Sequence, residues 1–505
     1  MLGSEELKDL YQRVVGDEAT ARFGLNIPQY MQHQDMRNAD VFFGYQQIEN
    51  EALYIGKPQG KDGHVLVVGG AGSGKSSCIA IPTLRNWKGT FVAIDIKGEL
   101  LQNAAPFKKS KYPVKVFDFS REQGINLRYC RYDPFYLLRE GIEDDLVQNA
   151  REIAQAIIPV PTNAQEPFWS QAAQHILTAV ILYVCGLKEA DESGEMLKGT
   201  FNQAMELVQS KPIWEVIEEI SKSGNKAAKM HINQFCGIEY PEDNKMLAGI
   251  SAELSNRIMV FATDNRIRSA FAKDDDMMKW EDLEDHNILM RIPEDKLGQW
   301  DGAITMMLTQ LIRTLERRPD RYSNGGNLPP VLLLLDEFPR LGKIDVIQNA
   351  VSTLRSKGVT ICLVVQSLAQ LDKTYGKESR QIIVDNCQYK AILNVTDPEN
   401  QKTFSDMIGS INVLKNNVSD NSGISQGESS GSTVDESITY SDGKTHGVSR
   451  TIGTSTSVVR EPIIFPSELA ALKDIVLLTP EGFCRVKKLP YYQYLKKIPK
   501  TGSKT

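Results

Sequence analysis

The chain has 505 residues, more than one hydrophobic core normally organises, so its length favours two or three domains or one large domain with insertions. Hydrophobic residues at 41% and charged residues at 24% are ordinary for a soluble globular protein and argue against a wholly disordered, collagenous or membrane-embedded chain. The formal net charge of -6 means that any nucleic-acid contact must come from locally placed Lys and Arg, because there is no overall positive field.

Cysteine usage and the N-terminus indicate the expected compartment. The seven cysteines are scattered singly, with no CxxC pair and no histidine at zinc-ligand spacing, which favours a reducing compartment and no structural metal. The first residues are charged and lack the apolar core of a signal peptide. The longest apolar run, residues 176–187, falls short of the roughly 18 to 20 residues that span a bilayer and is interpreted as a buried helix. We therefore expect a cytoplasmic chain with no membrane-spanning segment.

In chain order, residues 1–63 form an N-terminal lead-in that ends in a predicted edge hairpin over 42–64. The first part of an α/β domain follows at 64–136. It opens with a short apolar strand, a glycine loop, a helix from Ser76 and a second buried strand over 91–101. This order is the βαβ unit of an α/β fold.

Helical periodicity replaces the strand pattern over residues 137–285 and predicts an all-α insertion domain. Its clearest segments are 149–158, 170–184, 201–209, 211–221 and 246–262. Strand patterns return in the second part of the α/β domain, 286–417, where 331–335 and 359–365 are apolar runs that end in polar residues. The predicted fold class is therefore α/β, with its sheet interrupted by an all-α domain.

The last part of the chain changes composition twice. Residues 418–458 are rich in Ser, Gly, Thr, Asn and Asp, a composition that buries too little apolar surface to offset chain entropy, so we expect a flexible insertion. Residues 459–505 predict C-terminal strands with a turn at 480–482, followed by a basic tail.

The strongest motif is a glycine loop that matches GxxxxGK[ST] between the first strand and its helix. Its expected nucleotide-binding residues are Gly69, Gly70, Ala71, Gly72, Ser73, Gly74, Lys75, Ser76 and Ser77. In such a loop backbone N–H groups turn inward around phosphate oxygens, and the helix N-terminus adds a favourable dipole. We expect Lys75 to bridge the β- and γ-phosphates of ATP and Ser76 to bind Mg²⁺. The alternative, a chance glycine-rich turn, does not account for the strand–loop–helix context.

A P-loop needs a distant carboxylate, and the apolar run over 331–335 ends in two acids. Parallel strands present their carboxyl ends at the edge where ligands of open α/β sheets bind. We expect Asp336 to hold Mg²⁺ and Glu337 to orient and polarise the attacking water. The alternative is that the two acids terminate the strand and cap the next helix.

Two further residues are candidates for catalytic roles. Gln366 follows the strand over 359–365 and is positioned to sense γ-phosphate or the lytic water; the alternative is a polar residue that marks a strand end. Arg355 could stabilise transition-state charge at a neighbouring subunit's γ-phosphate, or it could be a solvated residue near a helix C-terminus. Asp95, Lys97 and Glu99 end the second strand near the same edge, where a salt-bridged turn is the simplest interpretation.

With these motifs in order, the sequence resembles the VirD4/TraG family of type IV coupling proteins. The segments that carry the resemblance are 64–69, 95–100, 133–135, 168–169, 335–338, Gly358, 366–371, 375–376, 385–387 and 396–399. The resemblance implies a RecA-like P-loop ATPase interrupted by an all-α domain, with ATP and Mg²⁺ as cofactors. It also implies a homo-hexameric ring that moves single-stranded DNA with an attached relaxase to type IV secretion channel subunits. In that setting Arg355 looks placed as an arginine finger.

Members of that family typically carry N-terminal transmembrane helices, and no such helix is visible here. We therefore expect the chain at the inner face of the cytoplasmic membrane, with membrane contact through a partner. Basic residues of the all-α segment are the candidates for DNA contact: Lys226, Lys229, Arg257, Arg266 and Arg268. Two alternatives stay open, another ring-type DNA pump or secretion-assembly ATPase, and a substrate-recruiting receptor in which ATP binding is mainly structural.

Overall fold

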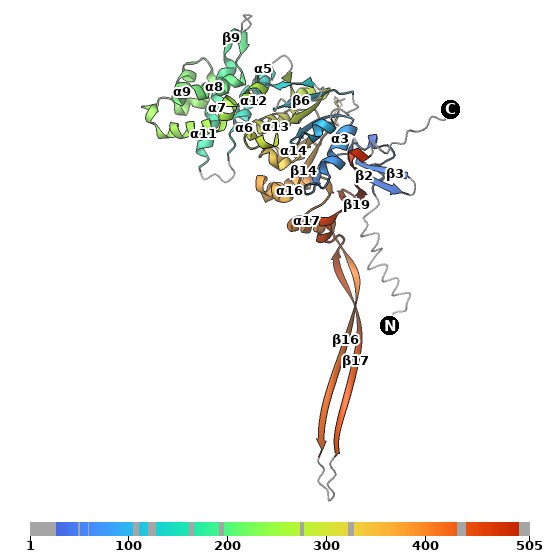
Figure 1. Ribbon diagram of the computed structural model, residues 1–505. Helices are drawn as coiled ribbons and strands as arrows, with labels where there is room; N and C mark the ends of the chain where they lie inside the picture. Colours follow the sequence, from blue (N-terminus) through green and yellow to red (C-terminus); the bar gives the residue numbers. More distant parts are fainter. Residues whose placement is uncertain are drawn as a thin grey trace, which may run out of the picture. The chain divides into compact units, whose positions relative to one another are not determined.

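The computed structural model describes residues 27–48, 51–58, 60–104, 111–119, 128–160, 166–190, 196–272, 277–321, 328–431 and 441–493 (Figure 1). These residues divide into two compact units. The larger unit contains the described residues up to 401 and those from 469 onward, and the smaller unit contains those between 402 and 468.

The larger unit is built on one sheet with strand order β1-β3-β2-β19-β18-β15-β4-β14-β13-β5-β12-β6-β7. Every pairing from β15 to β7 in that order is parallel. These parallel strands are β4 (Val65–Val68), β5 (Thr90–Asp95), β6 (Val114–Asp118), β7 (Arg128–Tyr129), β12 (Asn287–Arg291), β13 (Val331–Leu335), β14 (Val359–Val365) and β15 (Tyr389–Ile392). Strands β4, β5, β13 and β14 are buried at every residue, as expected of a parallel sheet covered on both faces. The α/β fold class is confirmed.

Antiparallel strands extend this sheet beyond β15. They are β18 (Asp474–Thr479), β19 (Gly482–Lys487), β2 (Val41–Ile48), β3 (Glu51–Lys57) and β1 (Gln32–His33). The β2–β3 and β18–β19 pairs confirm the two predicted hairpins. Two short pairs lie outside the main sheet: β8 (Arg131–Tyr132) with β11 (Met277–Met278), and β9 (Lys188–Ala190) with β10 (Met196–Lys198).

Helices connect the parallel strands. They are the π-helical turn η3 (Lys75–Ala80), α3 (Ile81–Asn86), α4 (Glu99–Asn103), α13 (Asp301–Glu316), the 3-10 helix η10 (Phe338–Leu341), α14 (Ile347–Thr353), α15 (Leu368–Tyr375) and α16 (Lys377–Asn386). A further helix, α17 (Pro398–Ile408), follows β15. The helix expected after the glycine loop is present, although its first turn is π-type. Most of the residues of α13 are buried, which makes it a central helix of the fold.

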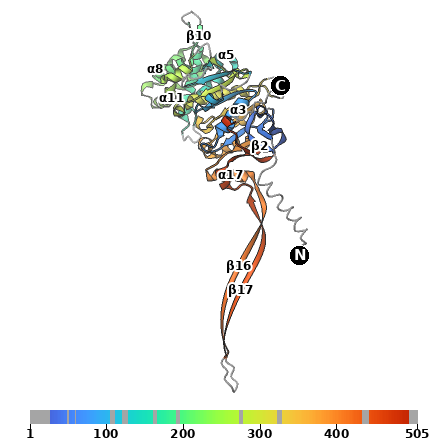
Figure 2. The same ribbon diagram turned by 45° about the vertical axis from the view of Figure 1, so that its right-hand side comes forward.

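The helices expected between the two halves of the sheet are also present. They are α5 (Tyr136–Glu140), α6 (Leu146–Ile157), α7 (Phe168–Gly186), α8 (Phe201–Ser210), α9 (Ile213–Lys222), α10 (Lys226–Ile232), α11 (Lys245–Thr263) and α12 (Asn265–Ala270). Figures 1 and 2 show α8 and α11 gathered with their neighbours at the end of the larger unit away from β2. Their starts are encoded locally: Thr200 and Gln203 form a capping box for α8, and Asn244 caps α11. That residues 137–285 form a domain of their own stays a prediction.

Helix α7 is the one described helix that is long and apolar enough to cross a membrane by length and composition. However, 67% of the 18-residue window that passes this test is buried inside the protein. Ile176, Leu177 and Val180 have no exposed surface. The helix packs against α6, α8, α10 and α11, so it is the buried helix predicted for residues 176–187.

The smaller unit contains two long strands where composition predicted a flexible insertion. β16 (Ser410–Gly431) and β17 (Ser441–Pro462) pair antiparallel along their whole length, from Ser410 with Pro462 to Gly431 with Ser441 (Figure 1). The part of the predicted insertion over 432–440 lies outside the described residues. A two-stranded ribbon satisfies its backbone by cross-strand hydrogen bonds and does not require the apolar alternation of a strand on a core, so composition did not indicate these strands. That the insertion is flexible stays a prediction.

Candidate active site

Parallel pairing brings four strand ends to one edge of the sheet. β4 pairs with β14, β14 with β13, and β13 with β5, all in parallel. The glycine loop follows β4, Asp336 follows β13, Gln366 follows β14 and Lys97 follows β5. The carboxyl edge of an open α/β sheet is where its ligands bind. Residues that lie far apart in the sequence therefore meet here.

The glycine loop has a backbone that requires glycine. Gly72 and Gly74 adopt φ values of 70° and 101°, which only glycine adopts without strain. A Cβ on Gly69 would lie 2.5 Å from the Ser73 Oγ, so the loop closes tightly on itself. The Gly70 N–H donates to the Asn394 carbonyl at 2.7 Å, which ties the loop to the chain after β15. A loop built in this way at a helix start is a cradle for phosphate oxygens.

Lys75 lies at the mouth of this loop and is 6% exposed. Its Nζ donates to the Gly69 carbonyl at 2.6 Å and to the Gly70 carbonyl at 3.1 Å. Burial lowers the pKa of Lys75, against the opposing influence of the nearby acids Glu337 and Asp336. Ser76 and Ser77 follow in the first turn of η3 and are partly buried, whereas Ala71 and Gly72 are exposed.

Asp336 and Glu337 are both buried at the end of β13, at 2% and 1% exposure. Burial, reinforced by the charge of Glu337, raises the pKa of Asp336 to about 7. Glu337 has φ 51° and ψ 39°, and among the described residues only Tyr240 shares this left-handed conformation without being glycine. Strained backbone of this kind persists where the surrounding structure holds it, as at functional sites. Here it accompanies a sharp change of chain direction directly after the strand.

Glu337 is held by two side chains from neighbouring strand ends. The Gln366 Nε2 donates to both of its carboxylate oxygens, at 3.0 and 2.9 Å, and the Lys97 Nζ donates to Oε1 at 3.0 Å. Burial alone would raise the pKa of Glu337, but these hydrogen bonds and the Lys97 charge outweigh it and lower the pKa. The Glu337 carboxylate is therefore ionised at neutral pH, whereas the pKa of its neighbour Asp336 lies close to neutral pH.

Lys97 is the site residue for which no role beyond a salt-bridged turn was predicted from the sequence. Asp95 forms that turn by accepting from the Gly98 N–H at 2.8 Å and from the Leu101 N–H at 2.7 Å. Lys97 is therefore left to reach across to Glu337. The available signal was a lysine two residues after a buried strand end, which is suggestive only once the order of the strands is known.

Arg355 is not brought to this site. It is exposed and lies in the turn between α14 and β14, four residues before Val359. β14 spans seven residues, or roughly 23 Å at about 3.3 Å per residue, and Gln366 follows its far end. Arg355 therefore lies at the opposite edge of the sheet from its own glycine loop and does not belong to the site of its own chain. A role at a neighbouring copy's site stays a prediction, beside the alternative of a solvated residue near a helix C-terminus.

Comparison with known proteins identifies relatives. The family model described as type IV secretory system conjugative DNA transfer matches residues 28–501. Protein VirD4 of Rhizobium rhizogenes is 24% identical over 389 residues, which cover 74% of this chain and 55% of that protein. Conjugal transfer protein TraG of Escherichia coli is 23% identical over 446 residues, 83% of this chain and 65% of that protein. The chain thus spans between half and two thirds of the length of these relatives.

Solved structures show the same fold. The plasmid coupling protein TrwB, in complex with the non-hydrolysable ATP analogue ADPNP, has a TM-score of 0.58 at 16% identity over 85% of both chains. TrwB with ADP and Mg²⁺ has a TM-score of 0.57 at 16% identity, again over 85% of both chains. Because the family model covers almost the whole chain, this protein belongs to the type IV secretory system conjugative DNA transfer family.

Proposed function

We propose that this chain is the motor of a type IV coupling protein, which binds and hydrolyses ATP with Mg²⁺ to move single-stranded DNA with its attached relaxase to a secretion channel. The observation that carries the proposal is the hydrogen-bonded Glu337–Gln366 pair at the sheet edge that also bears the glycine loop. A glycine loop by itself would also fit a switch protein that only binds nucleotide. A buried, ionised glutamate beside the loop adds a group able to orient and polarise water.

The residues of the site fit ATP and Mg²⁺. The loop leaves room for phosphate oxygens because its glycines have no side chains to fill the space. Lys75 supplies a positive charge at the opening of the loop. Ser76 and Asp336 offer the hydroxyl and carboxylate oxygens that Mg²⁺ prefers. A carboxyl group with a pKa of about 7 readily loses its proton to solvent when such a cation binds. The cation, when bound, neutralises charge on the phosphate oxygens.

The remaining side chains have distinct roles in this proposal. Glu337 orients the water that attacks the γ-phosphate and accepts its proton. Lys97 keeps Glu337 ionised, and Gln366 fixes its orientation while remaining within reach of the water. Arg355 completes the site of a neighbouring subunit in a homo-hexameric ring, which accounts for its position at the opposite edge of the sheet.

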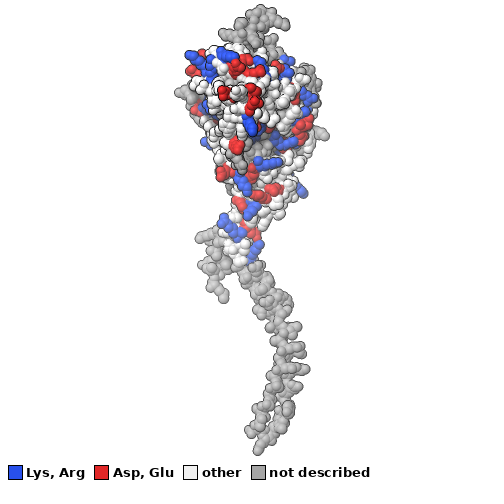
Figure 3. All heavy atoms as spheres, turned by 90° about the vertical axis from the view of Figure 1, so that its left-hand side faces the viewer, with Lys and Arg blue, Asp and Glu red and all other residues white. Residues whose placement is uncertain are grey.

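Contact with DNA is proposed for the ring's inner surface and not for a single basic face. Two of the expected DNA contacts are already paired, Arg257 with Glu253 at 3.4 Å and Arg268 with Glu206. Figure 3 shows Lys and Arg interspersed with Asp and Glu over the face of the larger unit turned to the viewer. Lys226 and Lys229 on α10 are the better candidates. We further propose a position at the inner face of the cytoplasmic membrane, with channel subunits supplying the membrane contact.

Two variants test the nucleotide chemistry. Lys75→Ala should abolish productive binding of a fluorescent ATP analogue, because it removes the cation at the loop mouth. Glu337→Gln should retain analogue binding but reduce kcat by about 10²- to 10⁴-fold, the range that general base catalysis contributes. Normal turnover by the Glu337→Gln protein would exclude Glu337 as the base. Undiminished analogue binding by the Lys75→Ala protein would exclude the loop as the phosphate site.

A further inference from the structure

The tyrosine–glycine pair singled out in the sequence ends helix α15, and it fastens that helix to the segment after Glu337. Tyr375 is 6% exposed, and its hydroxyl accepts from the Ile344 N–H at 3.2 Å and donates to the Gly342 carbonyl at 3.4 Å. Its ring stacks on Phe338 with centroids 5.4 Å apart and planes 18° from parallel. The neighbouring Thr374 hydroxyl donates to the Pro339 carbonyl at 3.3 Å. The Tyr375 ring, the Tyr375 hydroxyl and the Thr374 hydroxyl thus all join α15 to η10 and the residues that follow it.

Both of these elements begin at the candidate active site. Helix α15 starts at Leu368, two residues after Gln366, and η10 starts at Phe338, directly after Glu337. Gln366 and Glu337 are themselves hydrogen-bonded. The path from Glu337 through η10 to Tyr375, and back through α15 to Gln366, is therefore closed by hydrogen bonds at both ends. Packed side chains, hydrogen bonds and short helices of this kind are the elements that carry energetic coupling between sites.

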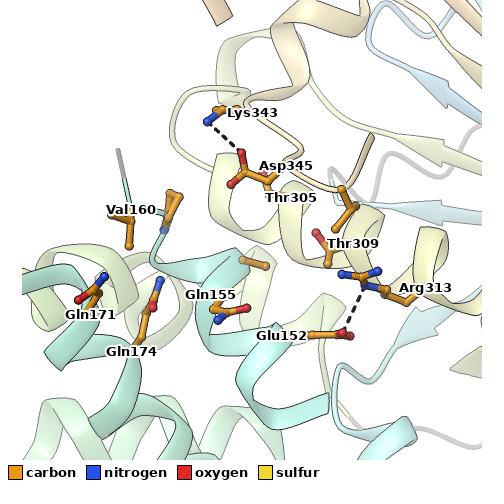
Figure 4. Close-up of a pocket in the computed structure, with 13 residues that line it drawn as sticks. Glu152, Gln155, Val160, Gln171, Gln174, Thr305, Thr309, Arg313, Lys343 and Asp345 are labelled. Carbon is orange, nitrogen blue, oxygen red and sulfur yellow. Dashed lines mark ion pairs between the residues drawn. The ribbon is translucent and has the colours of Figure 1, made fainter. Parts of the chain in front are cut away.

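The far end of the path forms one wall of a polar cleft. Lys343, Asp345 and Val346, which follow Gly342, line a cavity of about 330 Å³ together with residues of α6, α7 and α13. Figure 4 shows Gln155, Gln171 and Gln174 on one side of this cleft and Thr305 and Thr309 on the other. The cleft therefore lies between the helical region and the segment that follows the catalytic acid.

The charges of the cleft are paired across it and within its wall. Arg313 on α13 lies 3.3 Å from Glu152 on α6, and Lys343 lies 2.9 Å from Asp345 (Figure 4). Glutamine and threonine side chains supply the other polar groups, and all of them can donate and accept hydrogen bonds. Such a surface can change its hydrogen bonding when one wall shifts, without leaving a buried charge alone.

We propose that Tyr375 is a positioning residue that couples the Glu337–Gln366 pair to this cleft, so that nucleotide binding moves the wall formed by residues 342–346. The coupling rests on the proposed function and identifies the path by which ATP binding would reach the helical region. Conversely, the contacts of Tyr375 with the segment after Glu337 hold Glu337 in place. Loosening it should slow hydrolysis without weakening the phosphate cradle, because no residue of the glycine loop belongs to the path.

Tyr375→Phe tests the attachment, because it removes both hydrogen bonds of the hydroxyl and keeps the stacked ring. We expect kcat for ATP hydrolysis to fall roughly tenfold while the affinity for a fluorescent ATP analogue changes less than about twofold, since misplacement of a catalytic group lowers kcat and not ground-state binding. Tyr183→Phe is the matched control: the Tyr183 hydroxyl donates to Glu219 at 2.9 Å in the helical region, and its loss should leave both quantities unchanged. An unchanged kcat in the Tyr375→Phe protein would overturn the positioning role.

A second measurement follows the wall itself. An environment-sensitive fluorophore is attached at Asp345→Cys in a Cys236→Ser background, because Cys236 is the exposed native cysteine. Adding ADPNP with Mg²⁺ should change the fluorescence, and Tyr375→Phe should abolish that change although the analogue still binds. Thr374→Val, a milder loosening of the same attachment, should reduce it and serves if Tyr375→Phe does not fold.

The outcomes separate the coupling from the function on which it rests. Binding of ADPNP without a fluorescence change, or a full change in the Tyr375→Phe and Thr374→Val proteins, would overturn the coupling and leave the ATPase proposal intact. Failure of ADPNP to bind to the chain with native Tyr375 would overturn the proposed function and the coupling with it.

Discussion

The ionisation of Glu337 depends on Lys97, and the dependence has a measurable consequence. Burial favours the protonated form of Glu337, while the Lys97 Nζ at 3.0 Å and Gln366 favour the carboxylate, so the pKa of Glu337 is lowered. The proposed base is active only when it is ionised. Activity should therefore be lost as the pH falls through this low pKa. Lys97→Met removes one of the two opposing groups, leaves burial in place and must move the acid limb of the pH–rate profile to higher pH.

The size of the shift follows from the geometry. A hydrogen bond to a charged group contributes about 1.5–3 kcal/mol. The Lys97 side chain is 38% exposed, so solvent screening brings this contribution to the lower end of that range, about 1.5 kcal/mol. The assay is kcat for ATP hydrolysis at saturating ATP, measured across the acid limb.

Lys211→Met provides the matched control for this experiment. Lys211 lies 2.6 Å from Glu219 in the helical region, and its hydrogen bond and charge lower the pKa of that glutamate in the same way. Its loss should leave the acid limb in place. A profile that does not move in the Lys97→Met protein, or that moves equally in both variants, would refute the argument that Lys97 sets the ionisation of the catalytic base.

Three further predictions follow from the same geometry. Arg355→Ala should act in trans, so rings mixed from Arg355→Ala and Lys75→Ala subunits should hydrolyse ATP faster than rings of either variant alone; no gain on mixing would exclude the finger. Gly74→Ala forces a Cβ onto a backbone with φ of 101°, a strain of about 1–2 kcal/mol, and should weaken binding of an ATP analogue about tenfold in a fluorescence titration; unchanged affinity would contradict it. Asp95→Ala leaves the buried N–H groups of Gly98 and Leu101 without their acceptor, at about 1–3 kcal/mol each, and should lower both kcat and the thermal unfolding midpoint; an unaltered midpoint would show that the turn is held otherwise.

The features that could be predicted from the sequence are those whose causes are local. The strand β13 is an unbroken apolar run, the glycine loop sits between a strand and a helix, and the two hairpins have turn residues between apolar segments. Each of these patterns is complete within about 20 residues. The helices α6 to α9 and α11 were predictable for the same reason, since their apolar spacing is local in the chain.

The features that could not be predicted from the sequence depend on pairing between distant residues. Lys97 and Glu337 are 240 positions apart, and their contact follows only from β5 and β13 being neighbours in the sheet. The position of Arg355 at the edge opposite the glycine loop likewise requires the strand order. The β16–β17 ribbon escaped prediction because its strands pair through the backbone, which composition does not describe.

The most direct test of the motor is steady-state ATP hydrolysis by the purified chain with and without single-stranded DNA, with the Glu337→Gln protein measured in parallel and oligomer size followed by light scattering. The account predicts hydrolysis that single-stranded DNA stimulates, that accompanies ring assembly and that the variant lacks although it still binds ATP. ATP binding with hydrolysis that does not respond to DNA in the assembled ring would contradict it and would favour a recruiting receptor in which ATP serves mainly to hold the ring together.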